Sequence, residues 1–183
     1  NEHRLISKKE AIKKIHQPNN RQDIQQAVFR LKFEELFYLQ LELLIRKKLA
    51  TNKHKGFIFN EVGELFNSFF NKYLPFELTK AQKKVIKEIR KDFLSGSHMN
   101  RLLQGDVGSG KTLVALMSML LAADNSYQSA IMAPTEILAT QHFESLNTLL
   151  KDLPISIELL TGSTKKSKRR ELHEQLLNGK IDI

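Results

Sequence analysis

The chain has 183 residues, of which 41% are hydrophobic and 27% charged, and its 29 lysines and arginines outnumber its 20 acidic residues, giving a formal net charge of +9. This composition is typical of a globular protein. It excludes a disulfide scaffold, because there is no cysteine, and a membrane-spanning chain, because no run of about 18 apolar residues occurs. The charged N-terminal residues lack a signal-peptide core, so we expect a cytoplasmic location, and the positive charge favours a polyanionic partner.

Residues 23–50 predict one long helix, because apolar residues recur three or four positions apart without glycine or proline. Asp23 follows the loop-like Pro18-Asn19-Asn20 and is the expected N-cap. The apolar residues form more than one stripe, so we expect this helix to pack against two surfaces. Pattern and charge change near Pro75, which predicts a helical segment over residues 1–75 and a second domain over residues 76–183.

Short helical and strand-like segments alternate after Pro75. Helices are predicted at 79–94, 111–123, 136–150 and 166–177, and strands at 101–104, 129–133 and 155–160, with 181–183 as the start of a fourth strand. This order predicts an α/β fold with a parallel sheet flanked by helices, whose sites lie at the carboxyl ends of the strands. The last strand is cut short, so we expect the chain to end inside a domain.

A phosphate-binding motif lies between the first predicted strand and the helix that follows it. Residues 105–112 match the pattern G-x-x-x-x-G-K-[ST], and the residues expected to bind nucleotide are Gly105, Asp106, Val107, Gly108, Ser109, Gly110, Lys111 and Thr112. Glycines allow backbone N–H groups to converge on phosphate oxygens. Lys111 would place its charge between the β- and γ-phosphates, and Thr112 would offer its hydroxyl to Mg²⁺. The alternative is a glycine-rich turn, and a P-loop alone does not identify the class of NTPase.

Residues 76–82, Phe-Glu-Leu-Thr-Lys-Ala-Gln, resemble the Q motif of superfamily 2 helicases. In that family the glutamine reads adenine, so the resemblance implies that Phe76, Leu78, Thr79 and Gln82 bind the base of ATP. A glutamine amide suits this task because it can donate and accept a hydrogen bond at the same time. The alternative places Gln82 on the solvated face of a helix.

Two later segments also resemble helicase motifs. Residues 133–139 resemble motif Ia and residues 159–163 a further segment near the DNA path, which implies DNA-backbone contacts by Pro134, Thr135, Glu136, Thr161 and Gly162. The adjacent run 165–170 holds five cations in six residues, and its Lys165, Lys166 and Lys168 are further candidate DNA contacts. The alternatives are a βα loop capped by Thr135 and a solvated helix face.

The P-loop written over 103–112, together with segments 11–18 and 30–36, resembles the RecG family of ATP-dependent branched-DNA helicases. The resemblance covers residues 11 to 183. It implies a RecA-like motor over 76–183 and a linker over 1–75 that joins a DNA-binding wedge domain to it. It further implies ATP and Mg²⁺ as cofactors, Lys111 and Thr112 as catalytic residues, and branched double-stranded DNA, such as forks and Holliday junctions, as partner. The implied parent protein is bacterial, cytoplasmic and monomeric, and acts in recombination and repair.

An acidic Walker B motif, which motors of this family need for Mg²⁺ and for the attacking water, does not occur among the 183 residues. We therefore expect a fragment truncated before Walker B, which binds nucleotide at most and does not hydrolyse ATP by itself. One alternative is the motor of the transcription-repair coupling factor, which shares Gly-Asp-Val-Gly but usually carries an aromatic residue where Ser109 stands. The other is a non-catalytic DNA-binding module with a vestigial P-loop.

Overall fold

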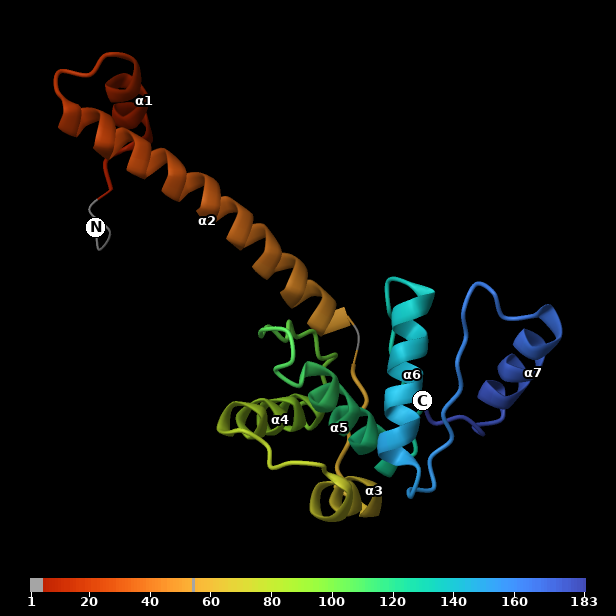
Figure 1. Ribbon diagram of the computed structural model, residues 1–183. Helices are drawn as coiled ribbons and strands as arrows, with labels where there is room; N and C mark the ends of the chain where they lie inside the picture. Colours follow the sequence, from red (N-terminus) through yellow and green to blue (C-terminus); the bar gives the residue numbers. More distant parts are fainter. Residues whose placement is uncertain (1–4, 54) are drawn as a thin grey trace. The chain divides into compact units, whose positions relative to one another are not determined.

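The computed structural model describes residues 5–53 and 55–183 and divides the chain into two compact units, Asn1–His54 and Lys55–Ile183 (Figure 1). The first unit holds α1 (Lys8–His16) and α2 (Arg21–Lys53). The second holds α3 (Glu64–Ser68), the π-helix η1 (Phe69–Tyr73), α4 (Lys80–Phe93), α5 (Lys111–Asp124), α6 (Glu136–Leu150) and α7 (Lys166–Leu177). Across the described ranges, none of the helices combines the length and apolar character needed to cross a bilayer.

The first unit is a helical hairpin whose turn is closed by polar side chains. Asn20 accepts a hydrogen bond from the Asp23 N–H at 2.9 Å, so Asn20 takes the N-cap role that the sequence had suggested for Asp23. Asp23 instead accepts the Asn19 N–H at 3.2 Å and pairs with Lys14 of α1 at 2.9 Å. The hydrogen bond from Lys14 lowers the pKa of the Asp23 carboxyl. Asp23 therefore ties α1 to the start of α2.

The long helix α2 packs against α1 within the first unit, and this is one of the two packing surfaces expected for it. Its first turns pack against α1, where Ala27 is fully buried. Farther along, its large apolar side chains are exposed in the described structure: Leu36, Phe37, Tyr38, Leu39, Leu43, Leu44 and Leu49. The helix is apolar on several sides there, as the sequence pattern indicates.

The core of the second unit is built around α5. Eight residues of this helix are buried: Leu113, Val114, Leu116, Met117, Met119, Leu120, Leu121 and Ala122. Ile86 and Ile89 of α4 and Leu146 and Leu150 of α6 belong to the same cluster. A helix that is apolar on all sides has to be covered on all sides, which explains the central place of α5.

The four helices predicted after Pro75 are present, with α6 and α7 at the expected residues and α4 and α5 within one residue of them. The predicted sheet is not confirmed, because no regular β-strand forms in residues 5–53 or 55–183. Three of the four extended segments are nevertheless joined by backbone bonds: Ser129 N–H to Asp182 O (2.8 Å), Ile183 N–H to Ser156 O (3.1 Å) and Glu158 N–H to Ile183 O (3.1 Å).

These bonds place residues 181–183 between the segments 129–133 and 155–160. The last two bonds are the pattern of a parallel pair between Ile183 and Ile157, so the alignment is parallel, as expected. Too few bonds form to extend it into a ladder. Leu102, in the extended segment before the P-loop, is 89% exposed, so this segment is not covered as a central strand would be.

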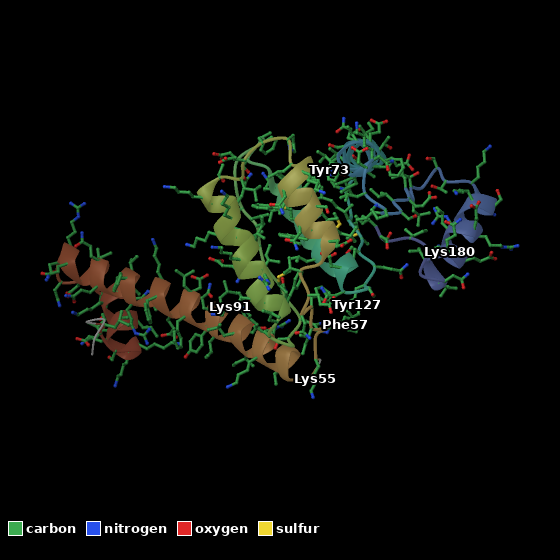
Figure 2. All side chains as sticks on the ribbon, turned by 90° about the horizontal axis from the view of Figure 1, so that it is seen from below. Lys55, Phe57, Tyr73, Lys91, Tyr127 and Lys180 are labelled. Atoms are coloured by element: carbon green, nitrogen blue, oxygen red, sulfur yellow. The ribbon has the colours of Figure 1, made fainter. Side chains whose placement is uncertain are left out.

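Residues 55–75 pack with the second unit, so the compact units divide at residue 54 and not near Pro75. The Gly56 N–H donates to the Gly96 carbonyl at 2.8 Å. The ring of Tyr127 contacts those of Phe57 and Phe59 at centroid distances of 4.8 and 4.9 Å, and Figure 2 shows Phe57 and Tyr127 together. Contacts between aromatic rings thus attach this segment to the chain beyond α5.

A single carboxylate anchors the next part of that segment. Asp124, the last residue of α5, accepts hydrogen bonds from the N–H groups of Gly63 at 2.9 Å, Leu65 at 3.0 Å and Phe66 at 3.1 Å. These N–H groups lie at the start of α3, where a helix leaves donors unpaired and favours negative charge. Asp124 therefore caps α3 from another part of the chain.

Replacing Asp124 by alanine is expected to lower the free energy of unfolding by about 2 to 4 kcal/mol, because three N–H groups lose a charged acceptor. Urea unfolding measures the loss, and hydrogen exchange should become faster at residues 60–70. The exposed acid Asp152 offers a matched control, since Asp152→Ala should change neither quantity. Unchanged exchange at residues 60–70 in Asp124→Ala would show that the cap does not hold α3.

Candidate nucleotide-binding site

The P-loop connects the extended segment 101–104 to the start of α5. Gly108 and Gly110 have φ angles of 78° and 80°, in the left-handed region that glycine adopts without strain. Gly110 is the N-cap of α5 and provides no side-chain acceptor. The first N–H groups of any α-helix lack helical acceptors, so this end of α5 presents donors and a positive dipole to an anion.

The two left-handed glycines differ in their surroundings. A Cβ atom at Gly110 would lie 2.4 Å from Nε2 of Gln82, whereas one at Gly108 would meet nothing within 4 Å. Gly110 is therefore required by its backbone angles, and a Cβ atom there would in addition displace the amide at the end of the Gln82 side chain. Gly108 is required by its backbone angles alone.

Lys111 folds over the loop that precedes it. Its Nζ donates to the carbonyl oxygens of Gly105 at 2.9 Å and Asp106 at 2.7 Å. In the described part of the chain no carboxylate pairs with Lys111. The ammonium group thus lies beside the loop backbone without a carboxylate partner, where a phosphate would be bound.

Gln82 links the start of α4 to the P-loop. Its Oε1 accepts the Thr79 N–H at 2.8 Å, the Thr79 hydroxyl accepts the Gln82 N–H at 3.2 Å, and its Nε2 donates to the Ser109 carbonyl at 3.0 Å. The residue is only 9% exposed, so the alternative of a solvated glutamine is wrong. One N–H of Nε2 and one lone pair of Oε1 are left over to form hydrogen bonds with a nucleobase. The Ser109 contact has no signal in the sequence, since 27 positions separate the two residues.

The other predicted base-binding residues lie in different environments. Leu78 is 5% exposed and belongs to the hydrophobic core of the second unit. Phe76 is 56% exposed and lines a hollow of about 360 Å³ together with Phe70 and Lys83. Among the described residues no group of three or more histidine or acidic side chains could hold a metal ion, so the predicted Mg²⁺ contact here rests on the Thr112 hydroxyl.

The two segments predicted to contact DNA are brought together by Glu136. Its Oε1 accepts the Ser163 N–H at 2.7 Å, which places the start of α6 beside the loop that contains Thr161 and Gly162. Thr135 caps α6 by accepting the Leu138 N–H at 3.3 Å. Glu136 is predicted as a DNA contact together with Pro134 and Thr135. In the structure its carboxylate already accepts a hydrogen bond, so Glu136 has a structural role.

The basic run contributes unequally to this face. Lys168 lies between Glu171 at 3.2 Å and Glu158 at 3.6 Å, and the hydrogen bond to Glu171 raises the pKa of its ammonium group. Lys165 and Lys166, at the start of α7, are exposed and form no ion pair within the described ranges. Arg169 donates to the Thr161 carbonyl at 2.7 Å and so holds the 161–164 loop. The sequence of the basic run does not show that Arg169, unlike Lys165 and Lys166, makes such a contact.

Residues 79–183 match the DEAD/DEAH box helicase family. The chain is 47% identical over 98% of its length to "ATP-dependent DNA helicase RecG" of Synechocystis sp., and 45% identical over 99% to the protein of the same name from Streptococcus pneumoniae. It is also similar to the solved "Structure of RecG bound to three-way DNA junction", with 41% identity, a TM-score of 0.85 and 99% of the chain covered.

The chain spans only part of these relatives. It covers 21% of the Synechocystis protein, 26% of the Streptococcus protein and 25% of the chain in the solved structure. The similarity extends across both compact units, since nearly all of the present chain is matched in each comparison. The fold of this region therefore corresponds to one part of a longer protein of the same kind.

The glycine geometry leads to a test on the nucleotide-free protein. Gly110→Ala should be more destabilising than Gly108→Ala, because both substitutions place alanine at positive φ, at a cost of about 1 to 2 kcal/mol, and only the first adds a clash with Gln82. Thermal unfolding of the two variants measures the difference. Equal losses would mean that displacing the Gln82 amide from the loop costs little free energy.

Proposed function

Because the chain belongs to the DEAD/DEAH box helicase family, we propose that its parent protein is an ATP-dependent DNA helicase acting on branched DNA. Its activity is to convert ATP hydrolysis into translocation on duplex DNA, with fork reversal and Holliday-junction branch migration as the outcome in recombination and repair. The observation that carries this proposal is the P-loop, whose left-handed glycines and unpaired Lys111 charge lie at the start of α5. Similarity to RecG proteins supports branched DNA as the substrate.

In this proposal the nucleotide is held from two helices. The remaining donor and acceptor of Gln82 read adenine, Thr79 holds the Gln82 amide, and the exposed ring of Phe76 is a further contact for the base. The N–H groups at the start of α5 and the Lys111 ammonium bind the phosphates. The Thr112 hydroxyl fits a Mg²⁺ ion, which neutralises charge on the phosphoryl oxygens when bound. The Gln82–Ser109 hydrogen bond carries any movement of the loop to α4.

The DNA-binding part of the proposal concerns the face joined by Glu136. The N–H groups at the start of α6 and the hydroxyl groups of the 161–164 loop suit phosphate oxygens, and Lys165 and Lys166 add positive charge. Such contacts position a backbone without reading base sequence. They therefore suit a motor that moves along DNA of any sequence.

Two other functions fit some of the residues. An RNA-polymerase-displacing translocase would share the P-loop, but Ser109 and the similarity to RecG proteins favour a branched-DNA helicase. Unwinding of forks by the purified parent, without effect on stalled polymerase, separates these two. A DNA-binding module with a vestigial P-loop is the second alternative. Binding of a fluorescent ATP analogue, competed by ATP but not by GTP, would reject it.

Substituting Lys111→Ala in the full-length parent should lower ATP turnover by about 100-fold or more, because the cation that stabilises the developing phosphoryl charge is removed. Steady-state ATPase assays measure this effect. The exposed Lys151 provides the control, and Lys151→Ala should hydrolyse ATP at the parent rate. Near-normal turnover in Lys111→Ala would remove the P-loop assignment.

Neutralising Lys165 and Lys166 together by glutamine should weaken DNA binding and make the salt dependence of log K less steep by about 2, since each phosphate contact contributes about 0.9. Lys168→Gln should change the slope less, because its ammonium already pairs with two carboxylates. Titrations of labelled fork DNA at several salt concentrations measure the slopes. An unchanged slope in the double variant would assign this run to a solvated helix face.

A further inference from the structure

A stripe of lysines runs along α4, and apart from Lys83, which also lines the hollow beside Phe76, it lies outside the site described above. Its members recur three or four positions apart and are all exposed: Lys80, Lys83, Lys84, Lys87 and Lys91. With Glu88 they line an open hollow of about 500 Å³, and Figure 2 shows Lys91 near the end of the helix. The opposite face of α4, with Gln82, Ile86 and Ile89, is buried in the unit. The lysines therefore form one outward-facing surface, here called the α4 lysine stripe.

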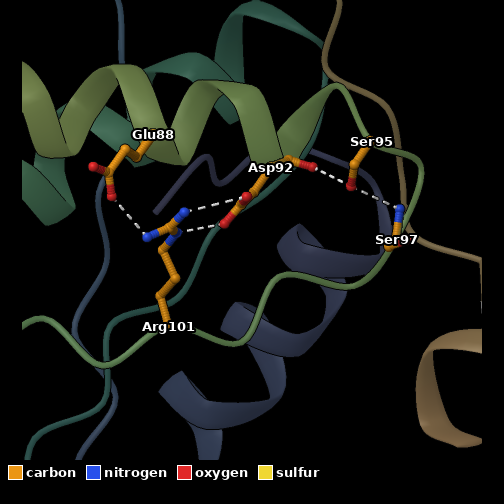
Figure 3. A network of polar contacts seen from close by, with 5 residues as sticks. All are labelled: Glu88, Asp92, Ser95, Ser97 and Arg101. Carbon is orange, nitrogen blue, oxygen red and sulfur yellow. Dashed lines mark hydrogen bonds and ion pairs between the residues drawn. The ribbon is translucent and has the colours of Figure 1, made fainter. Parts of the chain in front are cut away.

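The acidic residues of α4 do not neutralise this stripe. Arg101, in the extended segment before the P-loop, reaches back to both of them (Figure 3). Its Nη1 contacts Glu88 at 3.0 Å, while its Nε and Nη2 contact the two carboxylate oxygens of Asp92. The hydrogen bond to Asp92, with further attraction from Glu88, raises the pKa of the Arg101 guanidinium group. Glu88, which could pair with Lys84 or Lys91 one turn away, is engaged instead by an arginine.

The five lysines of the stripe have no ionic partner among the described residues. In the described part of the chain, none of the five side chains forms an ion pair or a hydrogen bond through its ammonium group. Like charges three and four positions apart on a helix repel one another. A bound polyanion would relieve this repulsion, because the carboxylates of α4 are paired with Arg101 and do not offset the lysine charges. The stripe is therefore suited to binding a polyanion.

We infer that the α4 lysine stripe binds the phosphate backbone of duplex DNA as a second contact surface, separate from the face joined by Glu136. From Lys80 to Lys91 the helix rises about 16 Å, a length over which duplex DNA carries about nine phosphates. Lysines are compact charges on flexible stems, which bind phosphates without reading bases. A lipid surface is a poorer match, because the apolar face of α4 is turned into the core and is not free to enter a bilayer.

This inference takes duplex DNA as the polyanion and so rests on the proposed function, but it adds a surface that, except for Lys80, lies outside the helicase-like motifs. The stripe begins beside Gln82, whose amide holds the Ser109 carbonyl of the P-loop. DNA bound along α4 therefore contacts the same helix that supports the nucleotide loop.

The test compares two triple variants of the full-length parent. The stripe variant carries Lys84→Gln, Lys87→Gln and Lys91→Gln, which lie away from the P-loop end of α4. The control carries Lys9→Gln, Lys13→Gln and Lys151→Gln, which remove the same charge from exposed positions elsewhere. Binding to an unbranched 30-base-pair duplex is measured between about 50 and 300 mM salt.

The stripe variant should bind the duplex about tenfold or more weakly at 0.1 M salt, with a slope of log K against log salt less steep by about 2 to 3. The control should bind the duplex within about twofold of the parent, because it removes the same net charge from positions outside the stripe. Equal affinities and slopes for the two variants would overturn the inference, and an acidic protein as the occupant of the stripe would give this result.

Two further measurements separate this inference from the proposed function. The stripe variant should bind the fluorescent ATP analogue as the parent does, which shows that it is folded. If the parent hydrolyses no ATP but its duplex binding depends on the stripe, the helicase proposal is rejected and the inference that the stripe binds duplex DNA is retained. A photo-crosslinker at position 87 should label duplex DNA while one at position 151 should not, and equal labelling at both positions would reject the stripe.

Discussion

The burial of α5 is the constraint on which the second unit depends. Eight of its residues are buried, and side chains of α4 and α6 complete the core around it. A helix that is covered on all sides cannot shift without opening cavities, and such losses cost about 2 to 5 kcal/mol for each large side chain. Both ends of α5 are consequently held in place. One end presents the P-loop and the other presents Asp124, which caps α3.

Several polar side chains outside this core connect segments that are distant in sequence, each as a hydrogen-bond donor or acceptor. Gln82 holds the Ser109 carbonyl, Glu136 holds the Ser163 N–H, and Arg101 holds the two acids of α4. The same connectors decide which charges remain available. Lys168 forms ion pairs with two glutamates, whereas Lys165, Lys166 and the α4 lysine stripe form none with the described residues. Net charge alone does not distinguish these groups, because it counts all cations equally.

The helices of the second unit could be predicted because their signals are local. Thr79 with Gln82 is a capping box, Thr135 is an N-cap, and the apolar spacing of 136–150 and 166–177 is helical. The cap of α2 was assigned to Asp23 because Asn20 and Asp23 are both good capping residues and lie three apart, and only the structure shows which one accepts. Strand pairing was predicted less well, because parallel strands bond to neighbours that are distant in sequence. The short α3 and the π-helix have no clear periodic signal and were not expected.

The sequence by itself determined the phosphate loop, its glycines, Lys111 and the helix that follows, because a continuous motif needs only neighbouring residues to take its shape. It also determined the helicase family, through motifs in a fixed order. Only the tertiary structure decided that residues 55–75 join the second unit, that Gln82 faces the P-loop and not solvent, and which lysines have no ion-pair partner among the described residues. These outcomes depend on contacts between residues up to 64 positions apart. Spacing along the chain carries no information about such contacts, because packing of the core selects them.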